Sequence, residues 1–129
     1  MAPRSEDEEQ LAAKYLDAFE RYDIAALTAL LHDDAVLSMP PYDLWLQGEA
    51  GIVGWFTGPG AECKGSRLVR VDGANGSPAW GQYRISPNGG HDPWCLMVLE
   101  TRDGKVTGIN SFLDTDRLFP LFGLPAHLD

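Results

Sequence analysis

Three polar side chains in the second half of the sequence could take part in acid–base chemistry: His91, Asn110 and Asp114. A neutral imidazole at His91, before the apolar run that starts at residue 93, could act as a base near pH 7. Asn110 lies in the last strand-like run, where its amide could polarise a carbonyl group inside a cavity. Simpler roles stay open, because His91 could be a solvated turn residue, Asn110 could bond to neighbouring strands and Asp114 could cap the next helix.

A second group of side chains has the chemistry of a pocket wall. Aromatic rings supply apolar area, and their polar tips can orient a ligand. We expect ligand-binding walls from Tyr15, Phe19, Trp45, Trp55, Trp80, Trp94 and Phe112, together with the amide of Gln82. Ordinary core packing is the alternative for each of them. Strand alternation places Trp80, Gln82 and Arg84 on one face of their strand and Gly81, Tyr83 and Ile85 on the other.

Motifs for metals and cofactors are missing from the sequence. His32, His91 and His127 are far apart, and Cys63 and Cys95 form no Cys-x-x-Cys pair. The glycines between residues 58 and 65 lack the Lys-Ser/Thr ending of a phosphate-binding loop, and no Gly-x-Ser-x-Gly elbow occurs. We therefore expect no metal and no cofactor, and two thiols that stay free.

Helical patterns dominate the first half of the chain. Ser5 and Glu8 form a capping-box pattern ahead of a helix whose apolar face repeats every three or four residues. Asp23 can cap a second helix, which we expect His32, Asp33 and Asp34 to end. A short strand over 36–39 follows, and residues 48–56 can form a third helix.

The second half has the period of strands. Runs over 66–71, 79–85, 93–102 and 105–113 are separated by Gly-rich turns, and Asp103-Gly104 is a strong hairpin signal. The sequence predicts an α+β domain, with helices packed over a curled antiparallel sheet. We expect one domain over residues 1–129, with a loose acidic N-terminus (1–9) and a C-terminal tail with a short helix (114–129).

Charge and hydropathy limit the partners. The 129 residues carry a formal net charge of −9, which disfavours direct binding to nucleic acids and to anionic membranes. No apolar run approaches the roughly 20 residues of a spanning helix, and the acidic N-terminus does not resemble a signal peptide. We expect a cytoplasmic protein.

Three segments resemble a known family: "YLDAFERYDIAALTALLHDDAVLSMPPY", "WLQGEAGIVGWF" and "GINSFLDTDRLFPLFGLP". They are similar to SnoaL-like domains of the nuclear transport factor 2-like superfamily, and above all to the C-terminal domain of actinobacterial extracytoplasmic-function sigma factors. The resemblance implies a cone-shaped fold with a pocket. It also implies a regulatory role beside a sigma-factor core, whose DNA-binding regions are absent from these residues.

Three functions remain open at this stage. The first is a regulatory domain that binds a hydrophobic small molecule or a sigma-factor core. The second is a cofactor-independent isomerase, cyclase or hydrolase, acting on a molecule such as a polyketide by general acid–base catalysis. The third is a dimerisation module that uses the outer face of the sheet, which is compatible with the other two.

Overall fold

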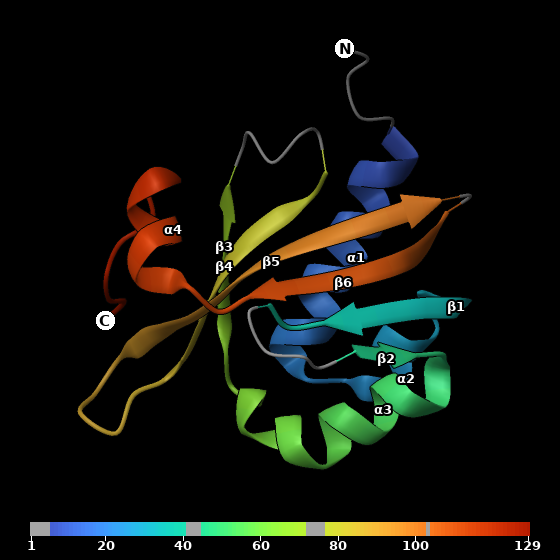
Figure 1. The fold of residues 1–129 in the computed structure, drawn as a ribbon, viewed down its shortest axis with the longest axis horizontal. Coiled ribbons are helices and arrows are strands. Elements are labelled where there is room, and N and C mark those ends of the chain that lie inside the picture. The colour runs from blue at the N-terminus through green and yellow to red at the C-terminus, as the bar shows by residue number, and fades with distance from the viewer. Residues whose placement is uncertain (1–5, 41–44, 72–76, 103) are drawn as a thin grey trace.

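A computed structural model describes residues 6–40, 45–71, 77–102 and 104–129. Within them, one bent six-stranded sheet of order β2-β1-β6-β5-β4-β3 separates helices on its two faces (Figure 1). The elements in chain order are α1 (Glu6–Arg21), α2 (Ile24–Thr28), β1 (Leu31–Ser38), β2 (Trp45–Gln47), α3 (Glu49–Thr57), the 3₁₀ helix η1 (Pro59–Cys63), β3 (Arg67–Val71), β4 (Ala79–Ile85), β5 (His91–Arg102), β6 (Lys105–Phe112) and α4 (Thr115–Leu121).

The curled meander predicted from the second half is confirmed. Strands β3 to β6 pair antiparallel in chain order, and Arg102 aligns with Lys105 across the β5–β6 hairpin. Strand β1 adds to β6 in parallel, with Ser38 opposite Asn110, and β2 closes the order antiparallel to β1. The sheet is therefore mixed at the β1 edge, and it is open rather than a closed barrel.

Helix α1 lies along the concave face of the sheet. Its buried side chains, among them Leu11, Tyr15 and Phe19, follow the predicted three- and four-residue spacing. The predicted cap at Ser5 lies outside the described residues. Asp23 does cap α2, since its side chain accepts a hydrogen bond from the amide of Ala26 at 3.1 Å. No helix in the described parts of the chain is long and apolar enough to cross a membrane.

The prediction that His32, Asp33 and Asp34 end the second helix is wrong. Helix α2 ends at Thr28, and these three residues belong to β1. Sheet pairing overrides the helical pattern, because the carbonyl of Leu30 already accepts a hydrogen bond from the amide of Val106 at 2.8 Å. Asp33 and Asp34 are exposed where the pairing of β1 with β6 shifts register.

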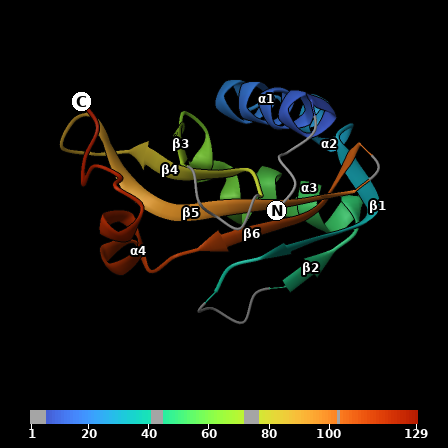
Figure 2. The ribbon, with the colours of Figure 1, turned by 90° about the horizontal axis from the view of Figure 1, so that it is seen from above.

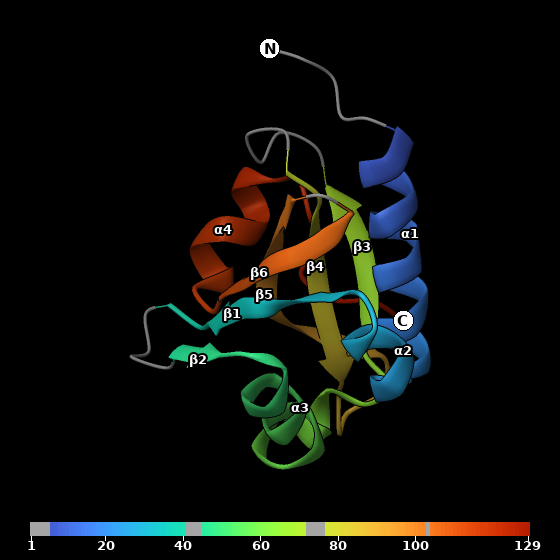
Figure 3. The same cartoon turned by 90° about the vertical axis from the view of Figure 1, so that its right-hand side faces the viewer.

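Two clusters of buried side chains lie on opposite faces of the sheet. The inner core fills the concave side under α1, α2, α3 and η1, and it contains Tyr15, Phe19 and Trp80. The outer core lies on the convex side under α4 and includes Tyr83 and Phe119. Figures 2 and 3 show α1 and α4 on opposite sides of the bent sheet. Residues that face the inner core are therefore the ones placed inside the cone.

Candidate functional site

A row of stacked aromatic rings forms the centre of the inner core. The ring of Tyr15 stacks on Trp80 at 5.6 Å between centroids and on Phe19 at 5.8 Å. Burial raises the pKa of the Tyr15 hydroxyl well above its usual value, and the hydroxyl donates to Sδ of Met97 at 3.1 Å. All four side chains are buried. The structure thus brings Tyr15, Phe19 and Trp80 together, as a packed cluster.

A neutral polar network crosses the same interior. Gln82 is fully buried, its Nε2 donates to the hydroxyl of Ser66 at 3.1 Å, and its Oε1 accepts from the thiol of Cys95 at 3.2 Å. Gln82 also shares a hydrogen bond with the thiol of Cys63, and burial raises the pKa of both thiols. These groups can bind a ligand by hydrogen bonds but stay uncharged near pH 7.

Two buried indole N–H groups of the inner core have no acceptor within the part of the chain that the structure describes. The Nε1 atoms of Trp55 and Trp80 are buried, and neither has a hydrogen-bond partner among the described residues. Trp55 packs against the inner core from α3, and its ring lies over Gly60 of η1. An unpaired buried donor costs about 1–3 kcal/mol, so each indole favours a bound acceptor.

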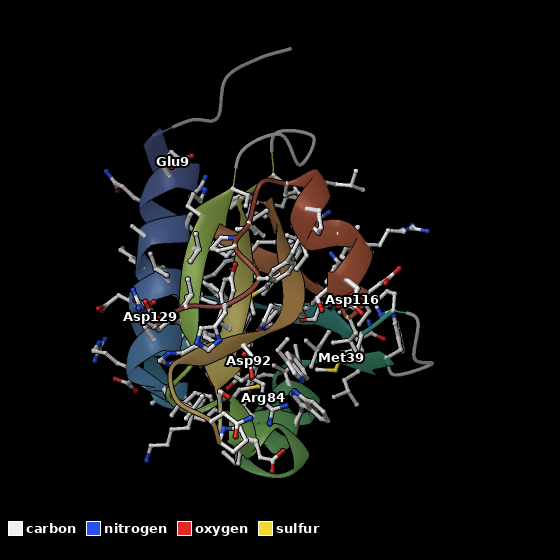
Figure 4. All side chains as sticks on the ribbon, turned by 90° about the vertical axis from the view of Figure 1, so that its left-hand side faces the viewer. Glu9, Met39, Arg84, Asp92, Asp116 and Asp129 are labelled. Carbon is white, nitrogen blue, oxygen red and sulfur yellow. The ribbon has the colours of Figure 1, made fainter. Side chains whose placement is uncertain are left out.

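A surface cavity borders Trp94 at the edge of the inner core. We name it the Arg84 pocket; its volume is about 420 Å³, and it is lined by Glu62, Lys64, Arg84, Ile85, Asp92, Pro93 and Trp94. The guanidinium of Arg84 lies over the ring of Trp94, 5.1 Å from its centroid, and its Nη2 is 2.7 Å from Oε2 of Glu62. Arg84 and Asp92 are partners in the β4–β5 register, and Figure 4 labels them close together.

The structure corrects the expected position of Asn110. Its Oδ1 accepts from the hydroxyl of Ser38 at 3.0 Å, and its Nδ2 donates to the carboxylate of Glu100 at 3.0 Å. These residues lie on the convex face, outside the cone. A β-bulge causes the change of face, because Val106 pairs with Thr101 while Gly108 pairs with Glu100. The extra residue reverses the alternation of side chains along the rest of β6.

The same bulge moves Phe112 out of the cone, where it packs against the outer core. Trp45 also lies apart from the aromatic row. It sits on the edge strand β2 with 60% of its surface exposed, while its neighbour Leu46 packs against the inner core. Strand alternation therefore directs the indole of Trp45 to the convex side.

His91 and Asp114 occupy the ends of elements. Nε2 of His91 is 3.1 Å from the carbonyl of Gly65, so this nitrogen carries the proton, and Nδ1 is buried with no partner in the described part of the chain. Asp114 is the N-cap residue of α4, but its side chain makes no capping hydrogen bond and lies 3.6 Å from Nε of Arg117. Neither side chain joins the Gln82 network.

Sequence reasoning missed part of the site. Nothing in the sequence marks Ser66, although it starts the strand-like run that pairs with the strand of Gln82. The pairing of Arg84 with Glu62 was also missed, because 22 residues separate them and only the fold brings η1 beside β4. The alternation that grouped Trp80, Gln82 and Arg84 was the one available signal, and it is confirmed: Gln82 and Trp80 face the inner core, and Tyr83 faces the outer core.

The bent, open sheet and the helices that cover it have the architecture of a nuclear transport factor 2-like fold. The chain belongs to the SnoaL-like domain family, whose model matches residues 12–109.

A curated relative is the extracytoplasmic-function RNA polymerase sigma factor SigG of Mycobacterium tuberculosis. The two sequences are 40% identical over an alignment 129 residues long, which covers 98% of this chain and 34% of SigG. The matched part of SigG is its C-terminal region. The chain thus spans about a third of the length of the curated relatives it matches.

Solved structures share the fold at lower identity. A candidate SnoaL-like polyketide cyclase from Shewanella putrefaciens superimposes with a TM-score of 0.69 at 15% identity, covering 91% of this chain and 86% of the other. The Δ5-3-ketosteroid isomerase from Mycobacterium sp. gives a TM-score of 0.60 at 16% identity, with coverage of 85% and 95%. These similarities establish the architecture.

Proposed function

We propose that this chain is a small-molecule-binding SnoaL-like domain that regulates a sigma factor. The regulatory part is supported by the 40% identity to the C-terminal region of SigG over nearly the whole chain. The ligand-binding part is supported by the chemistry of the inner core. The two parts make separate predictions, so each has its own experiment.

The unpaired indole N–H groups of Trp55 and Trp80 are the observation that carries ligand binding. They are donors in an apolar interior, where a hydrogen bond to a ligand replaces no bond within the described residues. The complementary molecule has a hydrophobic body and an acceptor oxygen, such as a carbonyl. It reaches the interior from the side of Trp94, which borders both the Arg84 pocket and the inner core.

The polar groups around these donors favour binding over proton transfer. Burial raises the pKa of the Tyr15 hydroxyl and of the Cys63 and Cys95 thiols, so all three remain protonated near neutral pH. Gln82 does not titrate. A domain that senses a ligand needs hydrogen bonds of this kind, whereas an isomerase or cyclase needs a group that takes up a proton.

A thermal-shift screen of the purified domain tests ligand binding. The compounds are hydrophobic carbonyls, epoxides and polyketide-like molecules. Every hit is recovered, and its molecular mass is measured by mass spectrometry. A ligand that binds only the folded state raises the melting temperature by mass action. We expect carbonyl hits that are recovered unchanged. Hits recovered chemically altered would replace the sensor with the cofactor-independent enzyme, and no hit in any class would contradict ligand binding.

Two matched tryptophan variants locate the hits. Trp55→Phe keeps an aromatic ring but removes the N–H donor, so we expect it to weaken carbonyl binding by about tenfold. Trp45→Phe makes the same chemical change on the exposed convex edge and should leave the affinity unchanged. Equal affinities of the two variants for the carbonyl compound would mean that the ligand does not contact the indole of Trp55.

The regulatory part is tested with SigG itself. The region of SigG outside the match is expressed separately, and its binding to this domain is measured by calorimetry with and without a hit from the screen. We expect association whose affinity changes when the ligand is present, because a ligand shifts an equilibrium only through different affinities for two states. The same affinity in both conditions would contradict regulation while leaving ligand binding intact.

A further inference from the structure

The Arg84 pocket holds a fixed cation in a chain that is otherwise strongly acidic. Of the 129 residues, Lys and Arg account for 10 and Asp and Glu for 19, yet Arg84 and Lys64 line the same cavity of about 420 Å³. The guanidinium of Arg84 is held over the ring of Trp94, and 23% of its side chain is exposed. The cation is therefore positioned before any ligand arrives.

The carboxylate that pairs with Arg84 is, by contrast, held weakly. Glu62 lies at 2.7 Å from the guanidinium, but 82% of its side chain is exposed. An exposed ion pair of this kind contributes little to stability, because water screens it and ordering a long side chain costs entropy. Glu62 can thus leave Arg84 without disturbing the core.

The other acidic group of the pocket is already engaged. Oδ1 of Asp92 is 2.8 Å from Nδ1 of His127, and a hydrogen bond from Ser86 adds to this contact. These hydrogen bonds lower the pKa of Asp92. Its charge is directed to the C-terminal segment, so Glu62 is the carboxylate that competes for Arg84.

We propose that the Arg84 pocket binds the carboxylate end of a small aromatic molecule, and that Glu62 occupies the place of this carboxylate when the ligand is absent. An Arg–carboxylate contact supplies charge-assisted hydrogen bonds of fixed geometry. Pro93, the part of the Trp94 ring that Arg84 and the inner core leave uncovered, and the exposed side chain of Ile85, 62% of which is accessible, supply the apolar surface for the ring. The inference deepens the proposed function, on which it rests, by naming an ionised group in the ligand.

The experiment compares 2-naphthoate with 2-naphthamide, which have nearly the same shape but differ in charge. Binding of each to the full domain is measured by calorimetry and by quenching of tryptophan fluorescence. Arg84→Gln should weaken naphthoate by about tenfold or more. Glu62→Gln should strengthen naphthoate by up to about fivefold, because it removes the competing charge. Neither variant should change the affinity for naphthamide.

Two controls keep the result interpretable. Arg67→Gln removes a cation from the exposed part of β3, outside the pocket, and should leave naphthoate binding as it is. Lys64→Gln removes the second cation of the pocket and should weaken naphthoate even if Arg84→Gln lowers the yield of folded protein. Salt should weaken naphthoate more than naphthamide.

Three results would overturn the inference: equal affinity for the two compounds, naphthoate binding that survives Arg84→Gln and Lys64→Gln, or no binding of naphthoate. Carbonyl hits from the thermal-shift screen would then still support the proposed function, and only the carboxylate site would be lost. An absence of carbonyl hits together with tight, Arg84-dependent naphthoate binding would support the carboxylate site and contradict carbonyl binding inside the cone.

Discussion

The indole of Trp80 packs inside the cone with 1% of its surface exposed. It stacks on Tyr15, and the guanidinium of Arg70 lies 5.4 Å from the centre of its ring. We expect Trp80→Ala to lower the free energy of unfolding by about 3–5 kcal/mol, because the change leaves a cavity that the surrounding rings cannot fill. Trp45→Ala, on the exposed edge, should change it by less than about 0.5 kcal/mol.

Urea unfolding followed by circular dichroism measures both variants. A loss below about 1 kcal/mol for Trp80→Ala would mean that its ring borders open space rather than a packed core. That outcome would contradict the dense packing of the inner core around the faces of the Trp80 ring.

The thiols of Cys63 and Cys95 are shielded from solvent by the inner core. Both are buried, and burial raises the pKa of each above 9.0, the value that the unfolded chain keeps. The raised pKa values contribute stability that is present below pH 9.0 and is lost as the pH rises above it. At neutral pH there is almost no thiolate to react.

We therefore expect iodoacetamide to leave both cysteines unmodified in the native domain at pH 8 and to modify both in urea. Mass spectrometry of the intact protein reads the result. Rapid modification of either thiol in the native state, at the rate found in urea, would contradict the buried network around Gln82.

Among the elements, the C-terminal strap (residues 125–128) is fixed by several independent contacts. The hydroxyl of Tyr83 donates to the carbonyl of Pro125 at 2.6 Å. The backbone of Leu128 pairs with His91 through hydrogen bonds of 2.7 and 2.9 Å. The strap thereby covers the start of β5, close to the pocket residue Asp92, which contacts His127.

Gly90 allows this close approach. A Cβ at Gly90 would collide with the carbonyl of Leu128 and the imidazole of His127, whereas a Cβ at Gly89 would meet nothing within 4 Å. Both glycines have a positive φ, +69° at Gly90 and +100° at Gly89, so alanine strains the backbone at either position. The difference between the two variants isolates the collision with the strap.

We expect Gly90→Ala to be less stable than Gly89→Ala by at least about 1 kcal/mol. The amide of His91, which donates to Leu128, should also exchange faster with solvent in Gly90→Ala alone. Thermal unfolding and hydrogen exchange measure the two effects. Equal stability and equal exchange would show that the strap is not held against Gly90.

Much of this element order could be predicted from the sequence. The third helix, the four strands of the meander and the hairpin between β5 and β6 follow from local periodicity and turn chemistry, and the structure confirms their order, although Asp103 of the predicted turn lies outside the described residues. Local patterns do not reveal the bulge in β6, which sends Asn110 and Phe112 to the convex face. They also miss the parallel pairing of β1 with β6, which begins at Leu31 and places Asp33 and Asp34 in the irregular part of β1.

For the candidate site, the predictable part was the composition of the inner core. Trp80 and Gln82 share one face of their strand, because side chains alternate along a strand. Tyr15 and Phe19 share one face of their helix, because they are four residues apart. These two periodicities predict which side chains face the inner core. The Arg84 pocket depends on η1 packing beside β4, which is a tertiary contact. No spacing in the sequence marks Glu62 as the partner of Arg84.

At the scale of the whole molecule, the domain has two faces with different properties. The concave side carries a packed interior with two indole donors that have no partner among the described residues, and the convex side is covered by α4 over β3, β4 and β5. The β1–β2 end of the convex side leaves Trp45 exposed. The ligand proposed above therefore belongs to the concave side.

The most direct test of ligand binding observes the indole N–H groups themselves. Each of the four tryptophans carries one indole N–H group, whose signal is followed in a ¹H–¹⁵N spectrum while a carbonyl hit from the screen is added stepwise. We predict that the signals of Trp55 and Trp80 move downfield as their N–H groups gain an acceptor, while the signal of Trp45 stays in place. Signals of Trp55 and Trp80 that do not move, or a change confined to Trp45, would contradict a ligand site inside the cone.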